Sequence, residues 1–290
     1  MPQHTVQSVH IVSKPGNRKA EALGREIGEW FARRGVSAVC TPFDCGFFEA
    51  LRMPETKPDI ALAVGGDGTM LSACRAAAGS GVPVIGINRG NLGFLAEVPA
   101  ENWQPVMTEI LAGNFGISPR IVLSCHIMRQ GREVPISRDE QNSDIAVNEV
   151  CLARGSLARV MDFEICVNDE LLGTIRSDGV IMSTPTGATG YSVSAGGPIL
   201  LPEMDVFTLT PVCPFLSFFP PLVVFGDSEV RVVVKNAGGG VLATLDGHNS
   251  IPLEKDDEVR IGRWPKRALI ATLSGYSYFG VLRDKGFIRG

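Results

Sequence analysis

Apolar positions in the first part of the chain form two kinds of pattern that follow each other in turn. Residues 8–13, 59–64 and 82–87 are short, nearly continuous apolar runs of strand length, as expected for parallel strands that are covered on both faces. Between residues 17 and 35, apolar side chains instead recur every three or four positions. This spacing predicts an amphipathic helix that is capped by Asn17 and ended by Gly35. The alternation of strand and helix predicts a doubly wound α/β domain with a parallel sheet.

The pattern changes after residue 117, where short β-branched segments follow one another between turns. Such spacing predicts an all-β, sandwich-like domain, in which we expect one helix over 188–195. The strands expected in it are 121–129, 145–152, 159–167, 180–183, 222–224, 230–234, 241–245, 258–261 and 267–273. The predicted organisation is therefore an α/β domain over 1–117, a β-sandwich over 118–275, and a C-terminal tail over 276–290 that returns to the first domain.

Composition and charge exclude several classes of protein. With 44% apolar and 20% charged residues the chain can bury a core, and its net charge of −4 argues against a protein that coats nucleic acid or a basic membrane-surface protein. The longest apolar stretch, 211–226, contains four prolines, and the N-terminus lacks the pattern of a secretory signal. Seven scattered cysteines without a CxxC pair indicate reduced thiols, and the four dispersed histidines argue against a zinc site. We therefore expect a cytoplasmic protein with no nucleic-acid or membrane partner.

A glycine-rich loop, GGDGT at residues 65–69, follows an apolar strand and precedes a helical stretch. Glycines at the carboxyl end of a parallel strand let the backbone approach a ligand closely, and a helix N-terminus offers N–H groups to a phosphate. Asp67 lies in the middle of this loop, where its charge would repel a phosphate. The carboxylate is explained if it takes a proton from an attacking hydroxyl or helps to hold Mg²⁺; the alternative is a tight turn with Asp67 as helix N-cap. P-loop and Rossmann motifs are absent.

Three further segments carry groups that suit a nucleotide. Residues 86–94 form a second glycine-rich loop after an apolar strand, and Phe94 in it suits either a base or the core. Asn148 and Glu149 interrupt an apolar strand, where they either chelate ribose hydroxyls or lie exposed on an edge strand. Residues 176–198 are rich in glycine and small hydroxyl side chains that can hydrogen-bond a polyol or an amide. The chain has 33 glycines where roughly 20 are expected, and the concentration of glycine in these loops indicates nucleotide binding.

In order and spacing, these motifs resemble those of the NAD kinase family. The matching stretches are GGDGT (65–69), GINxGxLGFL (86–95), NE (148–149), SDG…STPTGxTxYSxSAGGP (177–198), TPxCP (210–214) and DG (246–247). The resemblance implies an enzyme that transfers the γ-phosphoryl of ATP, or in some members of polyphosphate, to the 2′-hydroxyl of the adenosine ribose of NAD, giving NADP. It also implies Mg²⁺ or another divalent cation held through the nucleotide phosphates. Homodimers or homotetramers with a shared active site are expected, with NAD in the cleft between the two domains.

The resemblance further implies roles for single residues. Asp67 matches the family's catalytic base, which would orient the 2′-hydroxyl and accept its proton. The residues that match the phosphate loop are Gly65, Gly66, Gly68 and Thr69. The residues that match NAD-binding positions are Gly68, Phe94, Asn148, Glu149, Arg176, Asp178, Thr186, Thr189, Gly190, Tyr191 and Asp246. Among them, Phe94 is expected to line the adenine, Asp178 to contact the nicotinamide end, and Arg176 to favour NAD over NADH. No residue is expected to bind a metal directly.

The sequence departs from the family pattern at three places. Gly190 stands where alanine is usual, His248 replaces a common glutamine, and residues 215–221 lack the usual His and Arg. This last segment, rich in phenylalanine and proline, is expected either at a subunit contact or in the core. Two other functions stay open at this point. One is a lipid kinase that shares the GGDGT motif, and the other is an NAD-sensing module without catalysis.

Overall fold

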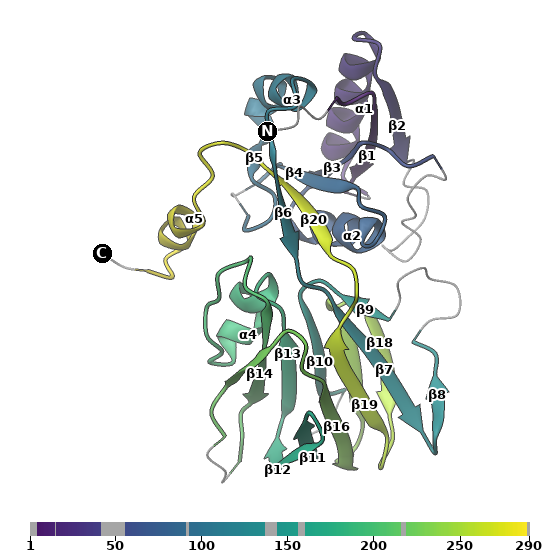
Figure 1. Cartoon of the computed structure of the whole chain (residues 1–290), viewed down its shortest axis with the longest axis vertical. Coiled ribbons are helices and arrows are strands. Elements are labelled where there is room, and N and C mark those ends of the chain that lie inside the picture. The colour runs from purple at the N-terminus through teal and green to yellow at the C-terminus, as the bar shows by residue number, and fades with distance from the viewer. Residues whose placement is uncertain are drawn as a thin grey trace. The chain divides into compact units, whose positions relative to one another are not determined.

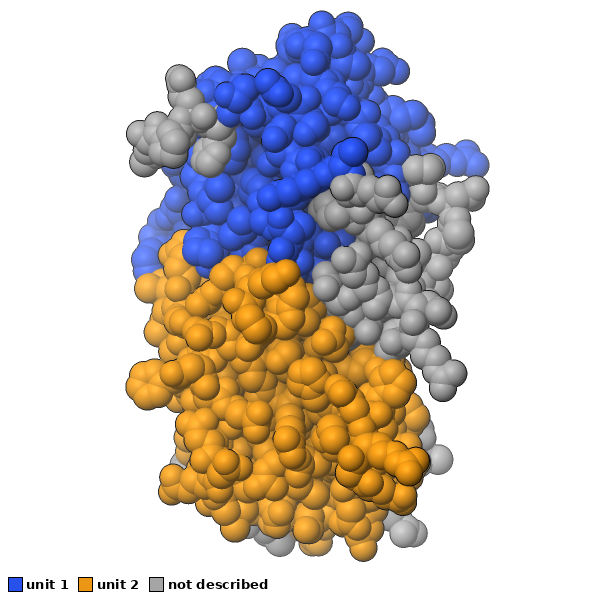
Figure 2. All heavy atoms as spheres, turned by 45° about the vertical axis from the view of Figure 1, so that its right-hand side comes forward, with its two compact units in different colours: residues 1–119, 268–290 blue, residues 120–267 orange. Residues whose placement is uncertain are grey.

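The chain forms two compact units, drawn in blue and orange in Figure 2. The first comprises Met1–Pro119 and Ala268–Gly290, and the second comprises Arg120–Arg267. The structure is a computed structural model and describes residues 5–14, 16–41, 56–90, 93–136, 144–155, 160–215 and 219–288. Each unit has an apolar core of its own.

The first unit is an α/β structure built on one sheet (Figure 1). Among the described residues its strands have the order β2-β1-β3-β4-β20-β6, with β5 paired to β4. The strands are β1 (Ser8–Ser13), β2 (Ser37–Thr41), β3 (Ile60–Gly65), β4 (Pro83–Asn88), β5 (Val98–Pro99), β6 (Gly116–Arg120) and β20 (Ala268–Thr272). The helices are α1 (Arg18–Ala32), α2 (Asp67–Ala77), η2 (Ala100–Asn102), α3 (Trp103–Leu111) and α5 (Tyr278–Asp284). Strands β1 to β5 pair in parallel, which confirms the predicted α/β domain.

Burial explains why these segments adopt their elements. All six residues of β3 and all six of β4 are buried, as continuous apolar runs require. Helix α1 buries one face that includes Leu23, Ile27 and Phe31. The side chain of Asn17 accepts the backbone N–H of Ala20 at 3.1 Å, so the predicted N-cap is confirmed.

One strand pairs in a different unit from the one we expected. β20 falls inside the predicted sandwich range 118–275, yet Leu269 pairs with Pro83 and Ile270 with Val84, both on β4 of the first unit. A short β-branched run fits either sheet, because local propensity does not specify the partner strand. The expected boundary at 275 is therefore corrected to 267, where the second unit ends.

The second unit is a β-sandwich of two antiparallel sheets (Figure 1). Among the described residues, one sheet has the order β15-β14-β13-β10-β17-β18 and the other β12-β11-β16-β19-β7-β8, with β9 paired to β7. The strands are β7 (Leu123–Arg129), β8 (Arg132–Val134), β9 (Ile145–Ala146), β10 (Glu149–Arg154), β11 (Met161–Val167), β12 (Glu170–Ser177), β13 (Gly179–Ser183), β14 (Val206–Val212), β15 (Leu222–Phe225), β16 (Val230–Asn236), β17 (Val241–Leu245), β18 (Asn249–Leu253) and β19 (Glu258–Arg263); the helical turns are η3 (Gly187–Thr189) and α4 (Tyr191–Ser194). Phe163, Met182 and Phe207 belong to the core that both sheets share. The predicted β-sandwich is confirmed.

Two predicted elements of this unit are divided in the structure. The expected strand 145–152 is split into β9 and β10, which belong to different sheets. The expected helix 188–195 consists of the turn η3 and the short helix α4, separated at Gly190. In the first case the chain changes sheets at Val147 and Asn148, so Asn148 of the polar pair lies between the two strands and Glu149 begins β10. Within the described residues, no helix is long and apolar enough to cross a membrane.

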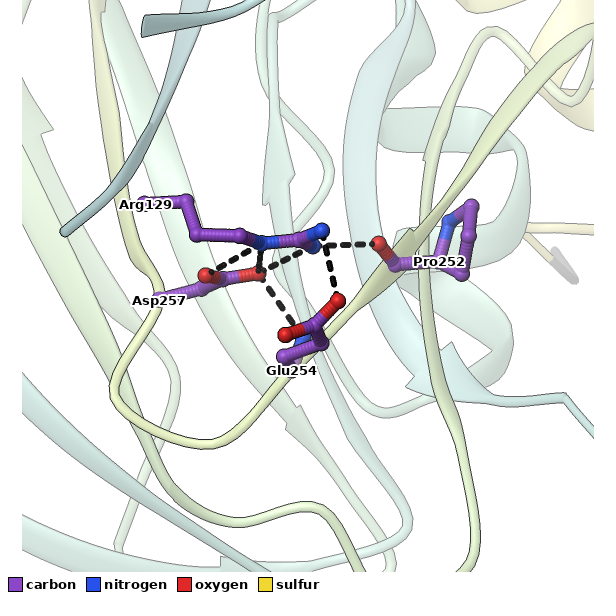
Figure 3. Close-up of polar contacts among 4 residues, drawn as sticks. All are labelled: Arg129, Pro252, Glu254 and Asp257. Atoms are coloured by element: carbon purple, nitrogen blue, oxygen red, sulfur yellow. Dashed lines mark hydrogen bonds and ion pairs between the residues drawn. The ribbon is translucent and has the colours of Figure 1, made fainter. Parts of the chain in front are cut away.

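An ion pair between the half-buried Arg129 and the buried Asp257 links β7 to the turn between β18 and β19 (Figure 3). Arg129 Nε donates to both carboxylate oxygens of Asp257, at 2.9 and 3.2 Å, and Nη2 donates to Asp257 Oδ2 at 2.7 Å and to the Pro252 carbonyl at 3.0 Å. Arg129 Nη1 lies 2.7 Å from Glu254 Oε1. Asp257 is only 1% exposed, and its buried charge is compensated by this bidentate guanidinium and by the Glu254 N–H, which donates to Oδ2 at 2.8 Å.

Candidate functional site

A pocket of about 340 Å³ lies at the carboxyl edge of the parallel sheet in the first unit. Most of its walls come from the segments that follow β1, β3 and β4. Strand order reverses at β1, since β2 lies on one side of it and β3 on the other, and open α/β sheets bind ligands at such a switch point. The lining residues are Lys14, Asn17, Gly65, Gly66, Asp67, Asn88, Arg89, Gly90, Gly93 and Lys285.

The pocket is predominantly positive. Lys14, Arg89 and Lys285 line it with exposed side chains, whereas its lining contains one carboxylate, that of Asp67. Helix α1 begins at this edge, and so does α2, whose first residue is Asp67. Helix N-termini carry partial positive charge and free N–H groups, which favour anions. The pocket therefore suits a polyphosphate group.

The glycines of the first loop have different structural reasons. A Cβ on Gly65 would clash with the side chain of Thr69, which is buried, so packing requires that glycine. A Cβ on Gly66 or Gly68 would meet nothing within 4 Å. Gly66 is the N-cap of α2, so the alternative of Asp67 as N-cap is wrong. Gly66 lines the pocket, and the absence of a packing reason at this position indicates close approach of a ligand.

The Asp67 carboxylate connects the first glycine loop to the second. Its Oδ2 accepts the backbone N–H of Phe94 at 2.8 Å, and its Oδ1 accepts those of Leu95 at 3.1 Å and Ala96 at 3.0 Å. A Cβ on Gly93 would clash with this carboxylate, which explains the glycine there. Oδ1 takes two of the three bonds and Oδ2 only one, so Oδ2 keeps a lone pair that can accept a further donor.

Phe94 packs against the C-terminal segment. Its ring lies 5.5 Å from the ring of Phe287, edge-on, and 6.3 Å from that of Tyr278. The Tyr276 hydroxyl donates to the Phe94 carbonyl at 3.4 Å. These contacts favour the packing alternative for the ring of Phe94.

In the second unit, three buried side-chain oxygens have no hydrogen-bond partner within the described part of the chain. They are Oδ1 of Asn148, Oε2 of Glu149 and Oγ1 of Thr186. Glu149 opens β10 opposite Ser183, the last residue of β13, and Thr186 follows in the next turn. Buried polar atoms without a partner are costly. Their presence on neighbouring segments indicates a site that a polar ligand completes.

Backbone contacts bring these segments together. Thr184 donates from its N–H to the Asn148 carbonyl at 2.8 Å and from its hydroxyl to the Val147 carbonyl at 2.6 Å. The Gly187 N–H in turn donates to Oγ1 of Thr184 at 3.1 Å. A Cβ on Gly187 would clash with the Asn148 backbone, so only glycine allows this approach.

Asp246 orients the polar pair from the other side. Its Oδ2 accepts the N–H of Val147 at 2.9 Å, and its Oδ1 accepts those of Asn148 at 2.7 Å and Glu149 at 3.2 Å. Asp246 is 6% exposed and has a φ of +52°, in the left-handed region that aspartate tolerates better than most residues. It thus positions the two residues that carry unpartnered oxygens.

Burial and a neighbouring charge alter the acidity of Glu149. Burial, and secondarily the negative charge of Asp246, raise its pKa from 4.5 to about 7. The group can therefore hold or release a proton near neutral pH. Perturbed carboxyls of this kind gather at functional sites.

Both units match domains of one protein family. The ATP-NAD kinase N-terminal domain matches residues 48–115, and the ATP-NAD kinase C-terminal domain matches residues 147–272. The NAD kinase of Nitratidesulfovibrio vulgaris strain DP4 is 44% identical over 288 residues, covering 99% of this chain and 93% of that protein. The chain belongs to the NAD kinase family. The NAD kinase of the Miyazaki F strain is 42% identical and covers 99% of both proteins.

Solved structures of NAD kinases share the fold. A yeast NADH kinase complexed with NADH has a TM-score of 0.85 at 24% identity, covering 99% of this chain and 90% of that one. An NAD kinase from Archaeoglobus fulgidus in complex with ATP has a TM-score of 0.72 at 24% identity, covering 98% and 99%. These likenesses extend the NAD kinase fold over nearly the whole chain.

Two charged positions that the NAD kinase resemblance singled out are ion-paired on the surface of the second unit. Arg176 Nε donates to Asp162 Oδ1 at 2.9 Å across the β11–β12 pair, and this bond lowers the pKa of Asp162. Asp178 Oδ1 lies 3.3 Å from Arg154 Nη1. The Arg176 side chain is 54% exposed and pairs with Asp162, whereas the three unpartnered oxygens are buried.

The hydroxyl-rich turn places its residues at different depths. Thr186 is buried, Thr189 is half-buried, and Tyr191 is 47% exposed at the start of α4. At Gly190 an alanine Cβ would lie 3.2 Å from the Gly187 carbonyl oxygen and 3.9 Å from Glu149 Oε2. The glycine found here therefore leaves open a space beside the Glu149 carboxyl that the family's usual alanine would fill.

No sequence pattern singled out the three cations of the pocket. Lys14 directly follows the first apolar strand and Arg89 lies within the second glycine loop. Both positions belong to the carboxyl edge of the predicted sheet, so these two cations could have been predicted from the sequence. Lys285 lies in the C-terminal tail, and only the folded chain brings it beside the first glycine loop.

Proposed function

We propose that this NAD kinase transfers the γ-phosphoryl of ATP to the 2′-hydroxyl of the adenosine ribose of NAD, giving NADP, with Asp67 as general base. The main support for the NAD kinase reaction is the similarity to an NAD kinase over 99% of the chain, together with both family domains. The lipid-kinase and NAD-sensing alternatives are not favoured. The contacts of Asp67 support its role. Location in the cytoplasm stays a prediction of the sequence.

Asp67 is suited to receive a hydroxyl proton. Three backbone N–H groups fix the orientation of its carboxylate, and Oδ2 keeps a lone pair for the donor. An aspartate is a weak base for an alcohol, so the proton moves late, as the bond from oxygen to phosphorus forms. Positioning and electrostatic stabilisation then supply most of the rate.

The pocket of the first unit is suited to the phosphates of ATP. Lys14 and Arg89 offset their negative charge, and the open backbone at Gly66 permits close approach. Arg89 also donates to the Lys19 carbonyl at 3.2 Å, which holds its guanidinium near this edge. Inorganic polyphosphate would use the same contacts, since none of them requires the adenine of ATP.

A divalent cation fits this pocket through the nucleotide. Within the described residues no cluster of three or more His, Cys, Asp or Glu side chains could hold a metal ion. Asp67 is largely occupied by backbone donors, and Oδ1 of Asn88 accepts the Gly90 N–H at 2.8 Å. Phosphate and water oxygens would therefore be the main ligands of Mg²⁺, which neutralises charge on the transferred group.

The polar group of the second unit is suited to NAD. The oxygens of Asn148, Glu149 and Thr186 are acceptors that ribose hydroxyls or an adenine amino group can satisfy.

Asp246 would act by positioning Asn148 and Glu149, since its own carboxylate accepts three backbone N–H groups. Gly190 and Tyr191 lie next to this group along the chain. Asp178 is expected toward the nicotinamide end, and Arg176 is expected to favour NAD over NADH.

The test is Asp67→Asn, with NADP formation followed in a coupled assay and NAD binding by calorimetry. We expect NAD affinity near that of the wild type and turnover lower by roughly 10²–10⁴-fold. Asp59→Asn is the matched control, because Asp59 also accepts backbone N–H groups, from Gln7 at 2.9 Å and Ser8 at 2.8 Å, away from the pocket. Turnover of Asp67→Asn at the wild-type rate would contradict the role of Asp67.

The edge strand β15 supports assembly into homodimers or homotetramers. β15 ends its sheet among the described strands and exposes Val223 and Phe225, the latter by 76%. Exposed apolar edge strands favour pairing with another chain. Phe225→Glu should shift the protein toward monomer in light scattering, and specific activity should then fall if a neighbouring subunit completes the site. An unchanged mass would argue against β15 as the contact.

A further inference from the structure

We infer that Lys285 and the aromatic side chains of the C-terminal segment 276–288 are part of the phosphate-donor site. In this inference, which rests on the proposed function, Lys285 binds the phosphates of the donor. The aromatic side chains of the segment hold Phe94 so that its N–H orients Asp67. The segment would thus bind the phosphate donor and also position the general base Asp67.

Lys285 is placed to meet an anion. It lines the same pocket as Gly65, Gly66 and Asp67, although it is far from them in sequence. Its side chain is exposed, and within the described residues it makes no ion pair that would occupy its charge. An ammonium group on a flexible stem suits a phosphate as a point charge.

The segment is anchored through one residue, Phe94. Phe287 contacts the Phe94 ring edge-on with centroids 5.5 Å apart, and Tyr278 lies 6.3 Å from it. Tyr276 donates to the Phe94 carbonyl at 3.4 Å. Helix α5 is itself capped, since the Ser277 side chain accepts the N–H of Gly280. Ring contacts and a backbone hydrogen bond therefore dock an ordered segment on the second glycine loop.

Phe94 is also a direct partner of the candidate base. Its N–H donates to Oδ2 of Asp67 at 2.8 Å, the oxygen that keeps a lone pair for the substrate. The two polar backbone groups of Phe94 thus face in two directions, the carbonyl to Tyr276 and the N–H to Asp67. Displacing the segment would loosen the loop that orients Oδ2, and small misplacements of a catalytic group are costly.

A tail that only stabilises the fold would behave differently. Loss of a purely structural contact lowers the fraction of folded protein and leaves the KM for ATP of the folded molecules unchanged. Loss of a phosphate contact raises that KM and weakens binding of any polyphosphate. A structural role and a phosphate-binding role are therefore distinguished by the KM for ATP and by the affinity for inorganic tripolyphosphate, a donor analogue without adenine.

The first experiment compares Lys285→Ala, Lys285→Arg and Arg283→Ala in the full chain. Arg283 is the matched control, since it is exposed in the last turn of α5, two residues before the C-cap Lys285, but does not line the pocket. We expect Lys285→Ala to raise the KM for ATP by roughly tenfold and to weaken inorganic tripolyphosphate binding similarly, with the KM for NAD unchanged. Lys285→Arg should recover most of the loss, because it keeps the charge.

The outcomes distinguish this inference from the proposed function. If the wild-type protein forms no NADP, the proposed function fails, while tripolyphosphate calorimetry still decides on Lys285. If Lys285→Ala binds tripolyphosphate as tightly as the wild type does, the inference is overturned whatever the activity.

A second variant tests the docking of the segment. Phe287→Ala removes the edge-on contact with Phe94, and we expect a fall in kcat of roughly tenfold in protein whose thermal unfolding is unchanged. Ile288→Ala, at the neighbouring exposed apolar residue, is the control and should keep kcat. An unchanged kcat in Phe287→Ala would overturn the positioning role.

Discussion

Asp67 and Asp246 make the same arrangement in two different units: each carboxylate accepts three backbone N–H groups from three consecutive residues. Asp67 holds residues 94–96, and Asp246 holds residues 147–149. In both cases one oxygen takes two of the bonds and the other takes one. Both aspartates stand in an Asp-Gly pair, and both fix a loop next to the candidate ligand groups. A carboxylate is suited to this because it offers about four lone-pair directions and no donor.

Asp246→Asn should weaken NAD binding without affecting ATP. Asparagine tolerates the φ of +52° equally well, so the change tests the carboxylate and not the backbone. Its amide NH₂ cannot accept the N–H groups that Asp246 accepts, and leaving one buried N–H unpaired costs about 1–3 kcal/mol. We expect a higher KM for NAD, an unchanged KM for ATP, and a lower urea midpoint. Asp256→Asn, at an exposed residue with a φ of +67°, should change none of these.

Glu149 should make stability fall as pH rises from about 4.5 to 7. Its pKa is raised from 4.5 to about 7 in the folded chain. Below pH 4.5 both states hold the proton and the group contributes nothing. Between 4.5 and 7 the unfolded chain loses its proton first, so folding becomes less favourable, by about 3 kcal/mol above pH 7.

Glu149→Gln should remove this loss of stability. In urea unfolding, the variant should match the wild type at pH 4 and exceed it at pH 8, while binding NAD less tightly. Glu170→Gln, at an exposed glutamate of the same unit, should keep the wild-type pH dependence. Parallel curves for Glu149→Gln and the wild type would contradict the assignment of the proton to Glu149.

Two glycine-to-alanine changes should differ in their effect on stability and in the substrate whose KM they raise. At Gly66 a Cβ has open space and the backbone is extended, so Gly66→Ala should change stability little, since the entropy gain offsets the poorer N-cap, and should raise the KM for ATP. At Gly187 a Cβ would clash with the Asn148 backbone, so Gly187→Ala should lower stability by about 1–3 kcal/mol and raise the KM for NAD. Kinetics and urea unfolding of both variants measure this. A KM for ATP unchanged by Gly66→Ala would contradict close approach of the donor.

Arg129→Met should destabilise the second unit strongly. It leaves the carboxylate of Asp257, which is 1% exposed, without its guanidinium partner (Figure 3), at a cost of about 3–5 kcal/mol. Arg129→Met combined with Asp257→Asn should recover part of the loss. Arg260→Met, which removes an exposed partner of Glu258, should leave the urea midpoint close to that of the wild type, because solvent screens an exposed pair. Urea midpoints compare the four proteins.

Prediction from the sequence succeeded where the signal is local. The apolar runs became β1, β3 and β4, the helical spacing after Asn17 became α1, and the β-branched segments became two antiparallel sheets. It failed where the partner lies far away along the chain. Residues 268–272 could join either sheet, and the apolar run around Ile145 gave no sign that the chain changes sheets before Glu149.

By itself, the sequence determined the two-part fold class, the carboxyl edge at which the glycine loops lie, and the family to which the motifs point. Periodicity and glycine placement are properties of neighbouring residues, so they can be read along the chain. Only the tertiary structure decided what Asp67 and Asp246 bind, which oxygens stay buried without a partner, and that Lys285 and Phe287 meet the glycine loops. These are contacts between distant residues, and they exist only when packing brings those residues together.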